Sequence, residues 1–383
     1  MKKKPSYGFG LFALWAIIVL SNESWAQTVG LNGQAIGWVT VNPSDPFQSQ
    51  AGLRYIPELS FSFPAGKYTI DGEFSANLWG SGTFQPGDST EWDHELSPYR
   101  MWVRFSGDQL ELRAGLQKIN FGSAVMFRPL MWFDRIDPRD PLQLTDGVYG
   151  LLGRYYFLNN SNIWLWGLYG DDNTKGWEKL PSKHNSIEYG GRVQIPFYTG
   201  EIAATYHHRT ADPKGVIPDS ITSGVTYPEN RLAIDAKMDL AVGLWVEGTL
   251  IHKKLDFSNL SYTPMLNAGI DYTFNLGNGL NMMAESFAYL QGQQAFGSDE
   301  KVFFGLVSAT YPISIIHNVS AMVFYDFSSK DFYRFINWGM AYDRWSFYVM
   351  GFWNPDTYNL YNLDYQTNLY SGWGFQLMAV FNH

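Results

Sequence analysis

The segment 120–146 stands apart for its mixture of charged and apolar side chains. Its charged members include Arg128, Asp134, Arg135, Asp137, Arg139 and Asp140. Arginine presents a planar fork of donors that binds carboxylates in fixed, bidentate pairs. Opposed acidic and basic groups also create a transverse field, which is a recurrent basis for selecting ions and polar solutes in a pore. The chemistry that this segment predicts is therefore recognition of small solutes.

The same segment is also rich in large apolar residues: Phe127, Leu130, Met131, Trp132, Phe133 and Ile136. Pro129, Pro138 and Pro141 stiffen it, because each proline ring fixes φ. A long loop that is both apolar and charged suits neither water nor lipid. We therefore predict that it folds into the interior of a closed structure and forms a constriction there.

Seven charged residues on the predicted neighbouring strands share the face that would point toward this loop: Arg100, Arg104, Glu111, Arg113, Arg154, Glu188 and Arg192. We expect the arginines to line one sector within reach of the acidic loop residues. A tight turn at Gly107 is expected to place Arg104 opposite Glu111, as a cross-strand ion pair. The sequence leaves open whether these charges select solutes or only anchor the loop.

Strands must position these side chains, since polar and apolar residues alternate over 68–78, 187–195, 231–240 and 266–276. Aromatic residues make up 17% of the chain and hydrophobic residues 45%, yet the mean hydropathy is −0.20. Short turns also alternate with longer polar loops. These features predict an all-β fold: a transmembrane antiparallel up-and-down β-barrel of about 18 strands, with 16 as the rival count. The segment 120–146 would be its third outer loop, folded into the lumen.

The N-terminus predicts export. Three lysines at positions 2–4 precede an apolar run over 11–20, and small residues at Ser24 and Ala26 fit a cleavage site, so 1–26 reads as a signal peptide. The remainder, 27–383, is assigned to the barrel. Cleavage removes three lysines and one glutamate, which takes the formal net charge from −9 to −11. This charge disfavours nucleic acid as a partner, and the absence of cysteine excludes disulfides.

The layout of 110–157 resembles that of outer-membrane porins of Gram-negative bacteria, including alginate-export-like families. It has a strand that ends in Gly115-Leu116-Gln117, an Asn120-Phe121-Gly122 turn, a long loop and a returning strand. The resemblance implies an outer-membrane channel for passive diffusion of small polar solutes, with no enzymatic activity, cofactor, metal or catalytic residue. The alternating last strand, 373–381, ends near a phenylalanine and resembles the signal that the barrel-assembly machinery reads. Outer-membrane lipid and lipopolysaccharide would surround the barrel.

Other functions remain open from the sequence. The chain could be a non-conducting barrel that docks to other outer-membrane proteins. A lipid hydrolase is a minor alternative, based on His184 and Ser186 on one strand face. A calcium site would use Asp134, Asp137, Asp140 and Asp146. Trp164, Trp166, Trp338 and Trp353 could form a sugar path, but an interfacial aromatic girdle is the simpler interpretation.

Overall fold

The computed structural model describes residues 28–170, 173–214, 216, 225–254, 261–295, 297, 299–356 and 367–383. The predicted signal peptide, 1–26, lies outside the described residues. The strands are β1 (Thr28–Asn42), β2 (Gln48–Ala65), β3 (Tyr68–Phe84), β4 (Glu91–Ser106), β5 (Leu110–Gln117), β6 (Val148–Tyr156), β7 (Asn162–Tyr169), β8 (Ile187–Phe197), β9 (Gly200–Ala211), β10 (Tyr227–Asp239), β11 (Gly243–Lys253), β12 (Tyr262–Phe274), β13 (Leu280–Gln291), β14 (Glu300–Pro312), β15 (His317–Asp326), β16 (Asp331–Ala341), β17 (Trp345–Trp353) and β18 (Trp373–Asn382), with a short 3-10 helix, η1 (Thr367–Tyr370), before the last strand.

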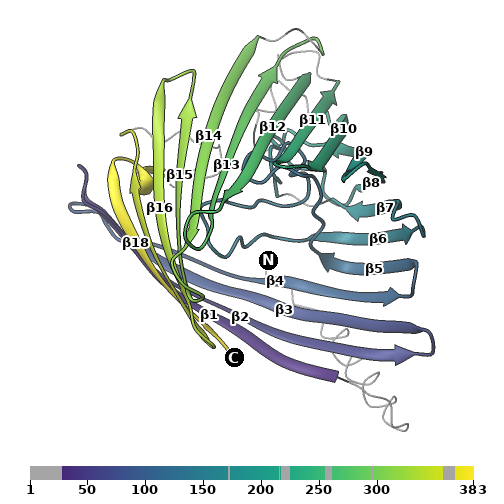
Figure 1. Cartoon of the computed structure of the whole chain (residues 1–383), viewed down its shortest axis with the longest axis horizontal. Helices are drawn as coiled ribbons and strands as arrows, with labels where there is room; N and C mark the ends of the chain where they lie inside the picture. The colour runs from purple at the N-terminus through teal and green to yellow at the C-terminus, as the bar shows by residue number, and fades with distance from the viewer. Residues whose placement is uncertain are drawn as a thin grey trace.

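Every strand pairs antiparallel with its neighbours in sequence, and β1 closes the sheet by pairing with β18 as well as β2. Figure 1 shows the resulting closed wall, in which colour advances around the barrel. The predicted up-and-down barrel is confirmed, and it has 18 strands instead of the rival count of 16. No helix in the described part of the chain is long and apolar enough to cross a membrane.

The two ends of the barrel differ in their connections. Turns of two to five residues join β2 to β3, β4 to β5 and every second pair thereafter. The other end carries most of the long loops, although β1–β2 and β15–β16 are joined there by loops of only five and four residues. The segment 118–147, between β5 and β6, is the third of these loops and is called loop 3 below. The next, 170–186 between β7 and β8, is called loop 4. Figure 1 shows loop segments running through the space that the strands enclose.

Alternation along the strands separates the two faces of the wall. On β10, Arg231 and Asp235 are buried toward the interior, whereas Leu232 and Ile234 are 55% and 62% exposed on the outer face. The last strand repeats the pattern, with Gln376 inside and Phe375 outside. Because the outward side chains are mostly apolar, the outer surface suits a hydrocarbon environment.

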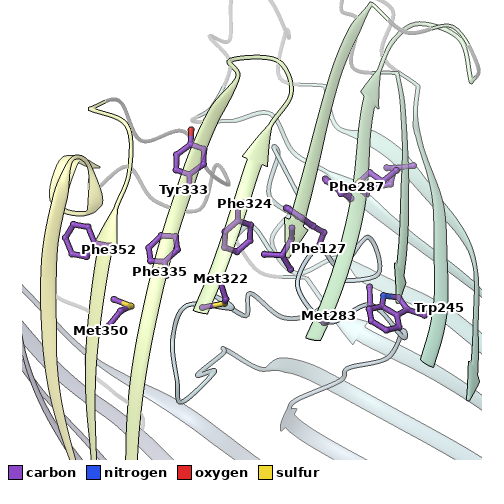
Figure 2. Packing of buried hydrophobic residues seen from close by; sticks show 14 residues of the cluster. Phe127, Trp245, Met283, Phe287, Met322, Phe324, Tyr333, Phe335, Met350 and Phe352 are labelled. Carbon is purple, nitrogen blue, oxygen red and sulfur yellow. The ribbon is translucent and has the colours of Figure 1, made fainter. Parts of the chain in front are cut away.

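The interior wall is not polar throughout, although the alternation of polar and apolar residues along the predicted strands implies one polar face for each strand. Side chains on β13 to β17 that point inward form an apolar cluster: Met283, Phe287, Leu306, Met322, Phe324, Tyr333, Phe335, Met350 and Phe352. Figure 2 shows this row along neighbouring strands, with Phe127 of loop 3 against it. These strands carry apolar residues on both faces, because loop 3 covers part of their inner face.

Candidate functional site

Two wall carboxylates hold the first half of loop 3 inside the barrel. Glu247 on β11 accepts the amide of Ala124 at 2.7 Å, and Glu285 on β13 accepts the amides of Val125 and Phe127 at 2.8 and 2.7 Å. Backbone donors to a carboxylate make strong, charge-assisted hydrogen bonds. The predicted burial of loop 3 is confirmed, and its anchors are these two glutamates.

Aromatic side chains of loop 3 reinforce this attachment. Phe127 is fully buried and stacks on Phe287, with ring centroids 5.3 Å apart. Phe121, Trp132 and Phe133 form a second cluster on β6 and β7, where Phe121 stacks on Trp166 at 5.7 Å. Loop 3 therefore covers the inner wall from β6 round to β15.

Loop 4 also enters the lumen, which the sequence did not predict. Trp177 stacks on Phe287 at 4.9 Å and donates a hydrogen bond from Nε1 to the Arg128 carbonyl, at 2.8 Å. Arg135 of loop 3 donates to the carbonyl of Thr174 at 2.8 Å. The two loops therefore interlock. No pattern in the sequence indicates this insertion, since 172–184 resembles an ordinary polar loop.

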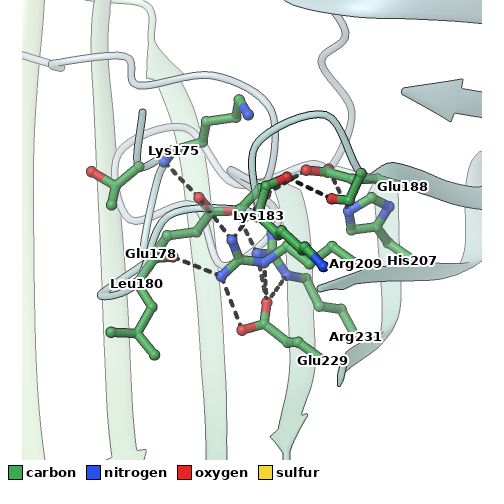
Figure 3. Close-up of polar contacts among 12 residues, drawn as sticks. Lys175, Glu178, Leu180, Lys183, Glu188, His207, Arg209, Glu229 and Arg231 are labelled. Atoms are coloured by element: carbon green, nitrogen blue, oxygen red, sulfur yellow. Dashed lines mark hydrogen bonds and ion pairs between the residues drawn. The ribbon is translucent and has the colours of Figure 1, made fainter. Parts of the chain in front are cut away.

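A buried ionic cluster fastens loop 4 to β9 and β10 (Figure 3). Glu178 lies 2.5 Å from Arg231 and 3.4 Å from Arg209. Glu229 bridges both arginines, at 2.6 Å each, and Lys253 lies 3.5 Å from Glu229. Removing one partner from such a cluster leaves a buried charge uncompensated, at a cost on the order of 3–5 kcal/mol.

The predicted loop charges pair with one another rather than with the wall. The Arg128 guanidinium lies 3.1 Å from the Asp134 carboxylate and also donates to the side chain of Asn120. The Arg139 guanidinium donates hydrogen bonds to both carboxylate oxygens of Asp137. Burial raises the pKa of Asp134 above its usual range, although Arg128 opposes the shift. The expectation that the wall arginines would meet these carboxylates is therefore wrong.

Asp140 is the loop carboxylate that has backbone partners only. Its two oxygens accept the amides of Leu142 and Leu144, at 2.9 and 3.2 Å. Burial raises the pKa of Asp140, and these two amides only partly offset the effect.

The wall arginines instead pair with wall acids. Arg104 binds Asp71 at 2.8 Å, and Glu111 contacts Arg104, Arg113 and Arg154 at 3.9, 3.0 and 3.5 Å. The register places Arg113 opposite Arg104, because the turn spans 107–109, so the predicted directly opposite pair is corrected to a diagonal one.

The other predicted wall residues also point inward. Arg192 binds Asp235 at 2.6 Å, and Arg100 donates to the carbonyl of Thr145 in loop 3 at 2.8 Å. Glu188 accepts from Ser182 of loop 4 and lies 3.2 Å from His207. These residues hold the loops and the wall together.

A cavity of about 180 Å³ remains between the second half of loop 3 and the inner wall of β1, β2, β17 and β18. Its charged lining residues are Arg54, Asp137, Arg139 and Asp140, and its other lining residues include Ile36, Trp38, Gln50, Met350, Tyr370 and Met378. Arg139 lies over the Tyr370 ring, at 4.9 Å from the centroid. This cavity is the candidate constriction, and Arg54 is a lining charge that was not among the residues predicted from the sequence.

No protein-family profile and no curated protein matches the sequence. Solved structures do match. OccAB1 of Acinetobacter baumannii aligns over 93% of this chain and 96% of its own, with a TM-score of 0.55 and 10% identity. OccK2 of Pseudomonas aeruginosa, solved in complex with glucuronate, aligns over 92% of this chain and 97% of its own, with a TM-score of 0.57 and 8% identity. The channel DcaP of Acinetobacter baumannii aligns over 93% of this chain and 97% of its own, with a TM-score of 0.52 and 11% identity. The chain shares the fold of outer-membrane channels.

The structure also locates the residues on which a lipid hydrolase or a sugar path would depend. His184 and Ser186 precede β8 and lie in loop 4, so they do not share a strand face as predicted. Trp166 is buried inside the barrel and donates to Nδ1 of His207 at 3.2 Å, and Trp164 packs beside it, so neither belongs to an outer girdle. Trp338 and Trp353 lie on the outer face as expected, 42% and 67% exposed.

The suggested calcium ligands are likewise engaged within loop 3 or separated. Asp134 and Asp137 each pair with an arginine, and Asp140 holds backbone amides. Among the described residues, no group of three or more potential ligands is arranged to hold a metal ion.

Proposed function

We propose that the protein is an outer-membrane channel for passive diffusion of small polar solutes. Residues 1–26 would direct export, and 27–383 would form the channel in contact with lipid and lipopolysaccharide. The barrel-assembly machinery would read its last strand during insertion. The proposal assigns no catalytic reaction and no cofactor to the chain.

One observation carries this proposal. Loop 3 is anchored inside the barrel by Glu247 and Glu285, yet its second half leaves a cavity whose lining carries charges of both signs. A loop that is rigidly held beside an open, charged gap can restrict solutes by size and charge. The shared fold with outer-membrane channels supports the same function.

A test is the single-channel conductance of the purified mature protein in a planar bilayer under a salt gradient, with sugars and organic acids as blockers. Discrete current steps with a reproducible reversal potential are the expected result. Current that is absent from a folded barrel would contradict the proposal.

A docking subunit is the second candidate, and the two inserted loops favour it. Loops 3 and 4 together cover the interior wall from β6 to β15. A non-conducting barrel filled in this way would serve as a rigid partner for other outer-membrane proteins. A folded barrel without current that co-purifies with a defined membrane partner would favour this candidate.

A further inference from the structure

The open space in the barrel lies on one side. Loops 3 and 4 cover the inner wall from β6 to β15, whereas the constriction cavity lies against β1, β2, β17 and β18. A second opening, of about 500 Å³, lies toward the short-turn end of β2 to β4 and is lined by residues that include Ser60, Asp71 and Arg104. Strand β2 contributes to both, through Arg54 and Ser60. An eccentric route along β2 would therefore connect them.

Arg54 is the arginine on this route that no carboxylate contacts directly, although Asp140 attracts it across the cavity. It makes no hydrogen bond or ion pair with any residue that the structure describes, and its Nε is buried. Its guanidinium lies 5.8 Å from the centroid of the Trp79 ring. A buried donor without a partner costs about 1–3 kcal/mol, so this group gains when an acceptor enters the cavity.

The other charges of the constriction are already engaged. Arg139 forms a bidentate ion pair with Asp137, and Asp140 accepts hydrogen bonds from two backbone amides. Farther along the wall, Arg104 and Arg113 share Asp71 and Glu111. Nε of Arg113 is also buried without a hydrogen-bond partner, but Arg104 and Arg113 are both bound to acids. Arg54 therefore differs from these lumen arginines in having no acid bound to it among the described residues.

We propose that solutes cross the constriction along the inner face of β2, and that Arg54 determines specificity by binding the anionic group of a passing solute. This inference rests on the proposed channel function. A guanidinium retains its charge across the physiological pH range and binds planar oxyanions through two parallel hydrogen bonds. Asp140, on the loop side of the same cavity, completes a field across the route and would disfavour solutes that carry several negative charges.

The first experiment compares Arg54→Gln with a control that removes the same charge elsewhere. Arg334 is suitable, because it lies on the outer face of β16 beside the exposed rings of Phe332 and Trp353. The measured quantity is the chloride-to-potassium permeability ratio from the reversal potential in a KCl gradient. We expect R54Q to lower this ratio about three- to tenfold, because the variant removes one positive charge that lies a few ångströms from the permeating ion in a partly hydrated site. R334Q should leave the ratio unchanged.

Chemical rescue separates a charge effect from misfolding. The chain has no cysteine, so R54C provides a single thiol. Modification of R54C with a positively charged methanethiosulfonate should restore the wild-type ratio, and a negatively charged reagent should lower it further. An R54Q channel with the wild-type ratio, or an R54C channel insensitive to the sign of the reagent, would overturn the role of Arg54. Absence of current in the wild type would instead overturn the channel function itself.

The route is tested by the same reagents at two other positions. Gln50 lines the constriction cavity on β2, whereas Thr249 lies buried on β11 on the covered side. We expect bulky water-soluble reagents to reduce the current of Q50C and to leave that of T249C unchanged. The reverse pattern would place the route on the opposite wall and refute the eccentric path.

Discussion

Glycine at two positions determines how closely the loops approach their partners. Gly122 has a φ of +99°, and a Cβ there would lie 2.3 Å from Oε1 of Glu247. Gly176 has a φ of +48°, and a Cβ there would lie 1.7 Å from the Met131 carbonyl oxygen. The first glycine brings loop 3 to its anchor, and the second brings loop 4 onto loop 3. The Asn-Phe-Gly turn noted in the sequence thus has a physical reason.

Gly122→Ala should loosen loop 3 without preventing barrel assembly. Both the unfavourable φ and the contact with Glu247 oppose the docked loop. The measurement is cleavage by protease within 125–145 of the folded protein, where the wild type should resist. Gly87 in the loop between β3 and β4 provides a control, because it also has positive φ but nothing lies within 4 Å of its Cβ position. Equal resistance in G122A and G87A would show that Gly122 does not hold loop 3.

The ion preference of the channel should depend on pH through Asp140. Its carboxylate is charged above its pKa, and burial raises that pKa, so on acidification the negative charge is lost at a higher pH than for an ordinary aspartate. The chloride-to-potassium permeability ratio should therefore rise as the pH falls from 8 toward the ordinary aspartate pKa of about 4.

Asp140→Asn should remove this dependence and give the high ratio at every pH. Reversal potentials over a pH series in both proteins provide the measurement. A pH response in D140N as large as in the wild type would assign the titration to another group.

Residue types in loop 3 were predictable, but their partners were not. Arg139 pairs with Asp137, two positions away, and Arg128 pairs with Asp134, six positions away. Such pairing depends on the backbone path of an irregular loop, which no periodicity describes. The sequence pattern does not single out Arg54, because Gly52 and Ile56 interrupt the polar alternation on its face of β2.

At the scale of elements, loop 4 acts as a brace for loop 3. Trp177 covers Phe287 and binds the Arg128 carbonyl, while Glu178 ties the loop to Arg209 and Arg231. The position of loop 3 therefore depends on an ionic cluster on β9 and β10 that does not line the constriction cavity.

Glu178→Ala should release loop 4 and increase single-channel conductance or current noise. The variant leaves Arg209 and Arg231 with Glu229 as their shared acid, and the loss of a buried ionic partner costs on the order of 3–5 kcal/mol. Lys183→Ala is the matched control, since Lys183 is an exposed charge of the same loop. Indistinguishable conductance in E178A and wild type would mean that loop 3 holds its position alone.

Strand periodicity predicted some elements and concealed others. The alternation of β10 and β12 is clear, because their inner faces are polar in part. The turn 240–242 between β10 and β11 was missed, because its Leu-Ala-Val sequence carries no polar turn signal. Strands β14 to β17 have apolar residues on both faces, since loop 3 and η1 pack inside them. Burial by a loop distant in sequence cannot be inferred from local pattern.

At the scale of the whole molecule, closure was predictable while the filling of the barrel was not. An up-and-down barrel needs only an even number of alternating strands with short turns at one end. The pairing of β1 with β18 over residues 34–41 follows from that arrangement. The asymmetric interior, covered on one side and open on the other, follows from contacts of two loops that the strand pattern does not contain.

The position of the bilayer around the barrel can be tested by placing charge on its outer face. Ile234 lies near the middle of β10, between the loop end at Tyr227 and the turn end at Asp239, and its side chain is 62% exposed. Leu158 is 93% exposed in the short turn between β6 and β7. If lipid surrounds the wall, Ile234→Arg should lower the free energy of unfolding by about 2–4 kcal/mol, and Leu158→Arg by about 0–1 kcal/mol. Reversible unfolding in lipid bilayers, followed by tryptophan fluorescence, measures both. Equal and small costs would mean that the middle of the wall contacts water, and the barrel would then lie outside the membrane.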